Sequence, residues 1–253
     1  MPTAARSLAA DRHRPTRFRV LRAWRSSLGK KVAVAASGVV LVGYVVLHMV
    51  GNLSVFSGAG APGHGEARID AYSHFLRTAG NPLFPTGTLL WLVRAFLLGA
   101  LVVHVTGIVQ LRRRNAAARP EGHPARRIGR SWSARTMRIT GPLLLAFIVF
   151  HILQFTTLTI DPTTLREGEI YANLYWAFQQ AWLVVLYVAA VVLLGLHLRH
   201  GTWSAIQTMG WSSRTRNPTM RLVASGLAAG VVVGFAAIPV AFWVGALPAP
   251  VAA

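Results

Sequence analysis

Five long apolar stretches constrain this chain more than any other feature of its sequence. They span Val32–Val50, Leu89–Leu111, Ile139–Leu158, Ala181–Leu198 and Leu222–Val244. Each is close to the roughly 20 residues that a helix needs to cross about 30 Å of hydrocarbon. Their apolar residues lie all round the predicted helix and do not alternate as in a strand. We therefore expect an all-α integral membrane protein with five transmembrane helices.

Charged residues are few and unevenly distributed. Only 13% of the 253 residues are charged, whereas a soluble domain usually carries about a quarter. Nine Lys/Arg lie in 1–31, nine in 112–138 and four in 199–221, whereas 51–88 and 159–180 together hold three, with five of the seven acids. Because cytoplasmic loops are rich in Lys and Arg, we expect a cytoplasmic N-terminus and a C-terminus outside.

This pattern predicts three parts of the chain. Residues 1–31 form a basic cytoplasmic arm, 32–247 a five-helix transmembrane domain and 248–253 a short outer tail. The basic segments suit the anionic surface of the lipid bilayer or an acidic partner, and nucleic acid is not an expected partner because no aromatic–basic platform is present. The chain has no cysteine, which excludes thiolate ligation of an iron–sulfur cluster and c-type haem attachment within it.

Four histidines fall one each on the first four predicted spans: His48, His104, His151 and His197. An ionisable side chain in lipid is costly and therefore suggests a functional site. Helical rise places His48 about 10 Å beyond its span's midpoint and His151 just beyond the middle of its own, both toward the outside. It places His104 roughly 6 Å and His197 roughly 12 Å to the cytoplasmic side. The histidines thus form an outer pair and an inner pair.

Two histidines facing each other across a bundle suit the two axial positions of a haem iron. Bis-histidine ligation leaves no open position, which favours electron transfer over oxygen binding. Haem propionates need cationic or hydrogen-bonding partners. For the outer haem the sequence offers Arg94, and for the inner haem it offers Lys30, Lys31, Arg112, Arg199, Trp132 and Ser37. Glycines near the histidines would allow a macrocycle, or simply a neighbouring helix, to approach the backbone closely.

Other readings of these histidines stay open. They could make interhelical hydrogen bonds, a proton relay, or a metal site in a transporter. A zinc site would draw its ligands to one depth, often with carboxylates, and no Asp or Glu lies inside any span. No internal repeat is obvious, which weakens the transporter reading.

The first span carries a pattern that resembles a known family. Gly29-Lys30-Lys31, Ser37-Gly38 and His48-Met49-Val50-Gly51-Asn52-Leu53 are similar to the opening helix of the succinate dehydrogenase cytochrome b membrane-anchor subunit. The similarity is to the bacterial single-chain, five-helix type, related to the anchors of fumarate reductases. Residues 69–77 resemble the outer loop of that family. With the helix count and the four histidines, the resemblance covers about 200 residues.

The resemblance implies cofactors and partners. Two b haems would use His48 with His151 and His104 with His197. A flavoprotein subunit and an iron–sulfur subunit would dock on the cytoplasmic face of a bacterial cytoplasmic membrane and pass electrons from succinate through the haems to menaquinone or ubiquinone. The dicarboxylate chemistry would belong to these partners. The candidate quinone-binding residues all lie in the outer loop: Asp70, Tyr72, His74 and Arg77.

One position departs from the family. Fumarate-reducing relatives carry a glutamate two residues before the helix-4 histidine, where this chain has Gly195. Succinate oxidation is therefore the expected direction. The alternatives are the cytochrome b anchor of another dehydrogenase, such as a hydrogenase or formate dehydrogenase, and a haem-free anchor or transporter.

Overall fold

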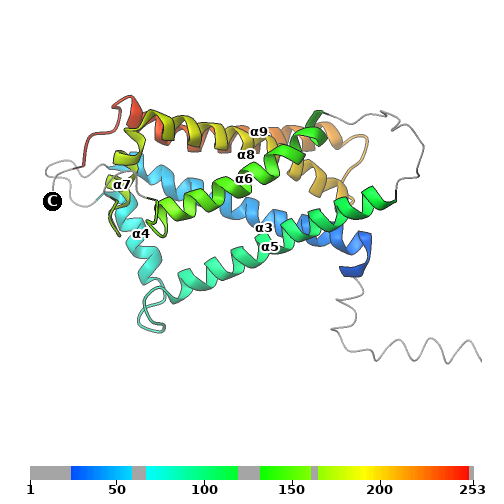
Figure 1. The fold of residues 1–253 in the computed structure, drawn as a ribbon, viewed down its shortest axis with the longest axis horizontal. Helices are drawn as coiled ribbons and strands as arrows, with labels where there is room; N and C mark the ends of the chain where they lie inside the picture. Colours follow the sequence, from blue (N-terminus) through cyan, green and yellow to red (C-terminus); the bar gives the residue numbers. More distant parts are fainter. Residues whose placement is uncertain (1–23, 59–66, 119–131, 161–164, 251–253) are drawn as a thin grey trace, which may run out of the picture.

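The computed structural model describes residues 24–58, 67–118, 132–160 and 165–250, and within them the secondary structure is helical without strands. The long helices are α3 (Ser27–Leu53), α5 (Thr88–Ala117), α6 (Trp132–Phe155), α8 (Ala181–Thr208) and α9 (Asn217–Trp243). The short ones are η2 (Ser54–Ser57), α4 (Arg68–Thr78) and α7 (Ile170–Phe178), which gather at one end (Figure 1). All five long helices are long and apolar enough to cross a membrane, which confirms the predicted all-α class and number of spans.

The helices extend beyond the apolar stretches at most of their ends. Helix α8 continues from Leu198 to Thr208, because a helix does not stop where its sequence turns polar and can project past the hydrocarbon. Helix α6 is shorter than predicted and ends at Phe155 rather than Leu158. Leu158 has a φ of 52°, and the Thr159 amide donates back to the carbonyl of Leu153 at 2.8 Å, which closes the helix.

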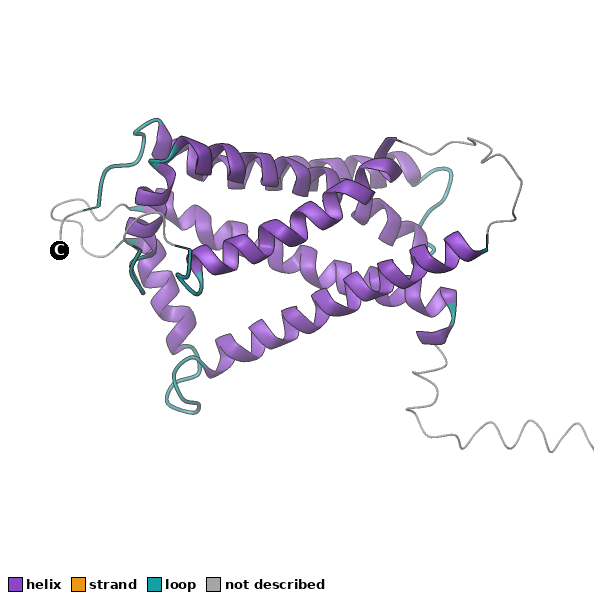
Figure 2. Ribbon diagram, in the orientation of Figure 1, coloured by secondary structure: helices purple, strands orange, loops and turns teal. Residues whose placement is uncertain are grey.

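The short helices lie at one end of the bundle, opposite the N-terminus of α3 and the C-terminus of α5 (Figure 2). We call the end with the N-terminus of α3 and the C-termini of α5 and α8 the basic end, because Lys31, Arg112 and Arg199 lie there. The end covered by α4 and α7 is the capped end. Which end faces the cytoplasm stays a prediction from the loop charges.

Helices α3, α8 and α9 form the centre of the bundle, with α5 packed on α3 and α6 packed on α8. Small residues allow these close approaches. A Cβ added to Gly195 of α8 would collide with Val232 of α9, and one added to Gly234 of α9 would collide with Met49 of α3. Leu198, Ala228 and Val231 are buried where these helices meet.

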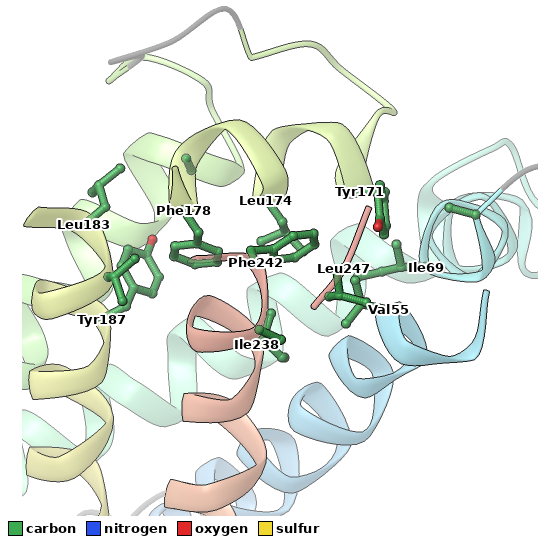
Figure 3. Packing of buried hydrophobic residues seen from close by; sticks show 14 residues of the cluster. Val55, Ile69, Tyr171, Leu174, Phe178, Leu183, Tyr187, Ile238, Phe242 and Leu247 are labelled. Carbon is green, nitrogen blue, oxygen red and sulfur yellow. The ribbon is translucent and has the colours of Figure 1, made fainter. Parts of the chain in front are cut away.

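Helix α7 closes the capped end over an aromatic cluster (Figure 3). Phe242 of α9 is 1% exposed and lies against Tyr171 and Phe178 of α7, with ring centroids 5.4 Å and 6.3 Å away. The Tyr171 hydroxyl donates to the carbonyl of Pro248 at 2.9 Å. Burial, with a smaller contribution from the Tyr175 phenol, raises the pKa of Tyr171, so this donor stays protonated.

Two facing histidine pairs as a candidate functional site

The four histidines meet as the two pairs that their depths predict. The ring centroids of His48 and His151 lie 6.0 Å apart, with an interplanar angle of 79°. Those of His104 and His197 lie 6.5 Å apart, at 56°. The first pair lies nearer the capped end and the second nearer the basic end, so the bundle holds two separate imidazole pairs along its length.

Each pair joins helices that are not principal packing partners. His48 of α3 meets His151 of α6, whereas α3 packs chiefly on α5, α8 and α9. His104 of α5 meets His197 of α8, whereas α5 packs chiefly on α3. All four rings are only partly buried. The histidines therefore reach across between helices whose backbones do not pack closely there.

The spacing within each pair suits two imidazoles that share one metal ion. Metal–nitrogen bonds of about 2 Å on opposite sides of an ion place the two ring centres roughly 6 Å apart. Neutral imidazole is the appropriate donor, and a second nitrogen that is hydrogen-bonded elsewhere fixes the tautomer. The donor set and spacing fit a bis-histidine haem iron at each pair.

His104 is oriented by the backbone of α3. Its Nδ1 lies 3.2 Å from the carbonyl oxygen of Val34 and 3.4 Å from Oγ of Ser37. A carbonyl can only accept, so Nδ1 donates and Nε2 keeps its lone pair for a ligand. The Ser37 hydroxyl itself donates to the carbonyl of Ala33 at 2.8 Å.

His197 is oriented by a residue of α6. Its Nδ1 lies 3.3 Å from Oγ1 of Thr140, whose side chain is buried. Gly141 adjoins the same ring, since a Cβ there would lie 3.9 Å from Cε1 of His197. The contact between this hydroxyl and Nδ1 fixes the orientation of the ring.

His48 has neighbours one helical turn away on each side. The ring of Tyr44 stacks on it with centroids 5.4 Å apart at 16°. The Asn52 amide nitrogen donates to the His48 carbonyl at 2.7 Å and lies 3.3 Å from Nδ1 of the ring. Phe235 of α9 covers a further side, with centroids 5.8 Å apart.

His151 lies in the most aromatic surroundings of the four. Phe147 and Phe155, both on α6, lie with their ring centroids 6.0 Å and 5.7 Å from it. Its Nδ1 lies 3.2 Å from the hydroxyl of Tyr187, a buried residue of α8. This polar contact inside an apolar region fixes the ring orientation.

The residues predicted to hold propionates are only partly gathered at the pairs. Ser37 lies beside His104, as described above. Lys31 is exposed at the basic end, and Arg199 donates from Nε to the Ser225 hydroxyl at 3.0 Å, which ties α8 to α9. Arg94 is exposed and stacks over Trp91, 4.9 Å from its ring centroid. Trp132 begins α6, but its side chain lies outside the described part of the chain.

The predicted quinone-binding residues share helix α4 but point to different neighbours. Asp70 accepts from the Tyr171 amide at 3.0 Å, at the N-terminus of α7. Arg77 lies 3.8 Å from Glu167, and His74 is exposed. Tyr72 packs on α3, where a Cβ on Gly51 would lie 2.6 Å from its ring. The four side chains therefore do not converge on one point.

The glycines near the histidines divide into three kinds. A Cβ on Gly38 would lie 3.3 Å from Cε1 of His104, so that glycine adjoins the pair near the basic end. Gly107 and Gly195 serve helix packing, against Val34 and Val232. A Cβ on Gly43 or Gly99 would have no neighbouring atom within 4 Å. These two glycines therefore support neither a role beside a histidine nor a role in helix packing.

Residues that support the rings were missed in the sequence, although some had a detectable signal. Tyr44 and Asn52 lie four residues before and after His48, and this spacing puts them on its helix face. Thr140 and Tyr187 lie on a different helix from the ring that they contact, and local spacing cannot reveal such partners. Within the described residues, no group of three or more His, Cys, Asp and Glu side chains could hold a metal ion.

Comparison of the chain with models of protein families, with curated proteins and with solved structures gives no match in any of the three.

Proposed function

We propose that the chain is the membrane-anchor cytochrome b subunit of a succinate dehydrogenase. The observation that carries the proposal is the meeting of four histidines as two pairs, with ring centroids 6.0 Å and 6.5 Å apart. A structural role for one histidine is ordinary, but two facing pairs from four different helices match a specific ligand chemistry. The first-helix motif and the outer loop favour the succinate dehydrogenase anchor within that chemistry.

His48 with His151, and His104 with His197, would hold the two b haems. When bound, each haem would supply a one-electron carrier at the depth of its histidine pair. The chain itself would fix the imidazoles, exclude water from them, and bind the partner subunits and the quinone that exchange electrons with the haems. Flavin, iron–sulfur and dicarboxylate chemistry would belong to two partner subunits on the basic face, which is cytoplasmic by the loop charges.

We place quinone at the capped end, near the His48–His151 pair. Tyr72 supports this location because it packs on α3 at Gly51, three residues beyond His48. Asp70, His74 and Arg77 lie along the same helix α4. Quinone reduction takes two protons with two electrons, and Asp70 and His74 are the titratable side chains closest in sequence to Tyr72.

The proposal is tested by purifying the chain with its associated subunits from the native membrane. We expect succinate to reduce b-type haem, seen in the absorption spectrum of the complex. Complete reduction by dithionite should show two haems per chain. Reduction by hydrogen or formate in place of succinate would assign the chain to another dehydrogenase. An intact complex without haem would exclude the cytochrome function.

A further inference from the structure

His151, Tyr187 and Gln154 form a chain of three polar side chains in an apolar region, and the last two are buried. Nδ1 of His151 lies 3.2 Å from the hydroxyl of Tyr187, and that hydroxyl lies 2.8 Å from Oε1 of Gln154. Gln154 is 0% exposed and Tyr187 is 8% exposed. The first and last members lie on α6, one turn apart, and Tyr187 reaches them from α8.

The direction of these hydrogen bonds follows from the inventory of protons. The amide oxygen of Gln154 can only accept, and the phenol has one proton, so Tyr187 donates to Gln154. The same hydroxyl must then accept from His151, which therefore carries its proton on Nδ1. Nε2 of His151 is left with a lone pair, which is the state that a metal ligand needs.

The Tyr187 ring has little freedom to leave this arrangement. Four phenylalanines surround it at edge-to-face angles of 64° to 80°, with centroids 5.0 Å to 6.5 Å away. They are Phe147, Phe150, Phe155 and Phe178. Such packing fixes the position of the hydroxyl, and only its proton can still rotate.

Gln154 is an expensive residue for packing alone. Its amide nitrogen is buried and has no hydrogen-bond partner among the described residues. A buried donor without a partner destabilises a fold, and an apolar side chain of similar size would avoid the loss. A functional role would explain why a glutamine is present here. Its side chain accepts a hydrogen bond from the Tyr187 hydroxyl, so we look for that role in this contact.

We propose that Tyr187 is a positioning residue that holds His151 in the tautomer required for axial ligation, with Gln154 fixing the direction of the Tyr187 hydroxyl. This inference rests on the proposed function, because it concerns how an axial ligand is prepared. It predicts that Gln154, which makes no hydrogen bond to His151, controls haem binding at that pair.

The two substitutions, Tyr187→Phe and Gln154→Leu, act in different ways. Tyr187→Phe removes the acceptor for Nδ1–H and leaves that donor buried without a partner. Gln154→Leu removes the acceptor for the Tyr187 proton, which then turns to Nδ1 of His151 and competes with the ligating tautomer. Since Gln154 acts only through the Tyr187 hydroxyl, adding Gln154→Leu to Tyr187→Phe should change nothing further.

The experiment uses the complete complex and measures two properties of each haem: its transfer rate to apomyoglobin and its midpoint potential. We expect Tyr187→Phe and Gln154→Leu each to speed loss of the His48–His151 haem about 10-fold, the lower end of the loss typical for partners of metal ligands. Its midpoint potential should rise, because a histidine that no longer donates a hydrogen bond gives less electron density to the iron. The other haem should keep its rate and its potential.

Tyr171→Phe is the matched control, because it removes a buried phenol hydroxyl at the same end of the bundle without contact to a histidine. It should leave both haems unchanged. Haem loss accelerated by Tyr187→Phe but not by Gln154→Leu, or additive effects in the double variant, would overturn the inference and leave the cytochrome function intact. Absence of haem from the unmodified complex would overturn both.

Discussion

The two histidine pairs share a bundle but are oriented by different kinds of group. The His104–His197 pair is held by the Val34 carbonyl and by the Thr140 hydroxyl. Side chains alone hold the other pair, since His151 depends on Tyr187, which in turn contacts Gln154. A backbone carbonyl cannot be removed by substitution, whereas a chain of side chains can be altered at each member. We therefore infer that the pair near the capped end is the more adjustable of the two.

The two pairs also differ in what surrounds them. The pair near the capped end lies close to the aromatic cluster that α7 covers, so its geometry depends on how that cap packs. The pair near the basic end lies between helices that meet through small residues, such as Gly38 beside His104. The first pair should respond to changes in the cap, and the second to changes in helix spacing.

Gly38→Leu should have the largest effect and should be confined to the basic-end pair. A Cβ at this position would already lie 3.3 Å from Cε1 of His104, and a leucine would push the ring out of line. We expect loss of the haem at that pair, seen as one haem per chain instead of two, with the other spectrum retained. Gly99→Leu is the control, because nothing lies within 4 Å of its Cβ position. Loss of both haems in Gly38→Leu alone would show that the pairs are not independent.

Phe242→Ala should weaken the capped end. Truncation of a buried phenylalanine typically destabilises a protein by about 3–5 kcal/mol, and this ring is 1% exposed. Thermal unfolding in detergent should occur at a lower temperature, and the His48–His151 haem should dissociate before the other. Trp243→Ala, at an exposed neighbouring position, serves as the control. Equal loss of both haems would contradict the separation of the two regions.

Thr140→Val tests the orientation of His197 by a hydroxyl. Loss of the hydroxyl leaves Nδ1 of the ring without this partner, and the net loss of one hydrogen bond typically costs about 0.5–1.5 kcal/mol. We expect faster dissociation of the basic-end haem, measured by transfer to apomyoglobin. Thr140→Ser keeps the hydroxyl and should restore the unmodified rate. Failure of serine to restore it would mean that packing of the methyl group, and not the hydrogen bond, orients the ring.

Asp70→Asn should have the smallest effect on stability, and it separates two roles for this residue. The asparagine keeps an oxygen that can accept from the Tyr171 amide, so the melting temperature should hardly change. Asp70→Ala removes that acceptor and should cost about 0.5–2 kcal/mol. If Asp70 also delivers protons to quinone, Asp70→Asn should lower quinone reductase activity in a complex that is still stable. Unchanged activity would limit Asp70 to supporting α7.

The sequence predicts the five spans and the pairing of the histidines, because both follow from position along the chain. Apolar length determines a span, and helical rise sets the depth of His48 and His151 without knowledge of how the helices pack. The same reasoning could not reach Tyr187. Which helix face meets another depends on side-chain packing, and nothing local to Tyr187 marks it as a partner of a histidine on α6.

Helix α4 shows the opposite case. Asp70 and Arg77 were singled out for chemistry, and both make contacts that support α7 and the segment before it. A short polar helix over a bundle needs such contacts whatever the chain does, so a sequence motif there cannot separate support from catalysis. Residues buried in the spans, such as Gln154, give the clearer signal because polar groups are costly there.

Haem content in paired histidine variants tests the central claim most directly. The account predicts that His48→Ala and His151→Ala, singly or together, leave one haem per chain, and that His104→Ala with His197→Ala does the same. Combining His48→Ala with His104→Ala should remove both haems, because each substitution disables a different pair. Loss of both haems when only His48 and His151 are changed, or one haem retained when His48 and His104 are changed together, would contradict the two-pair arrangement.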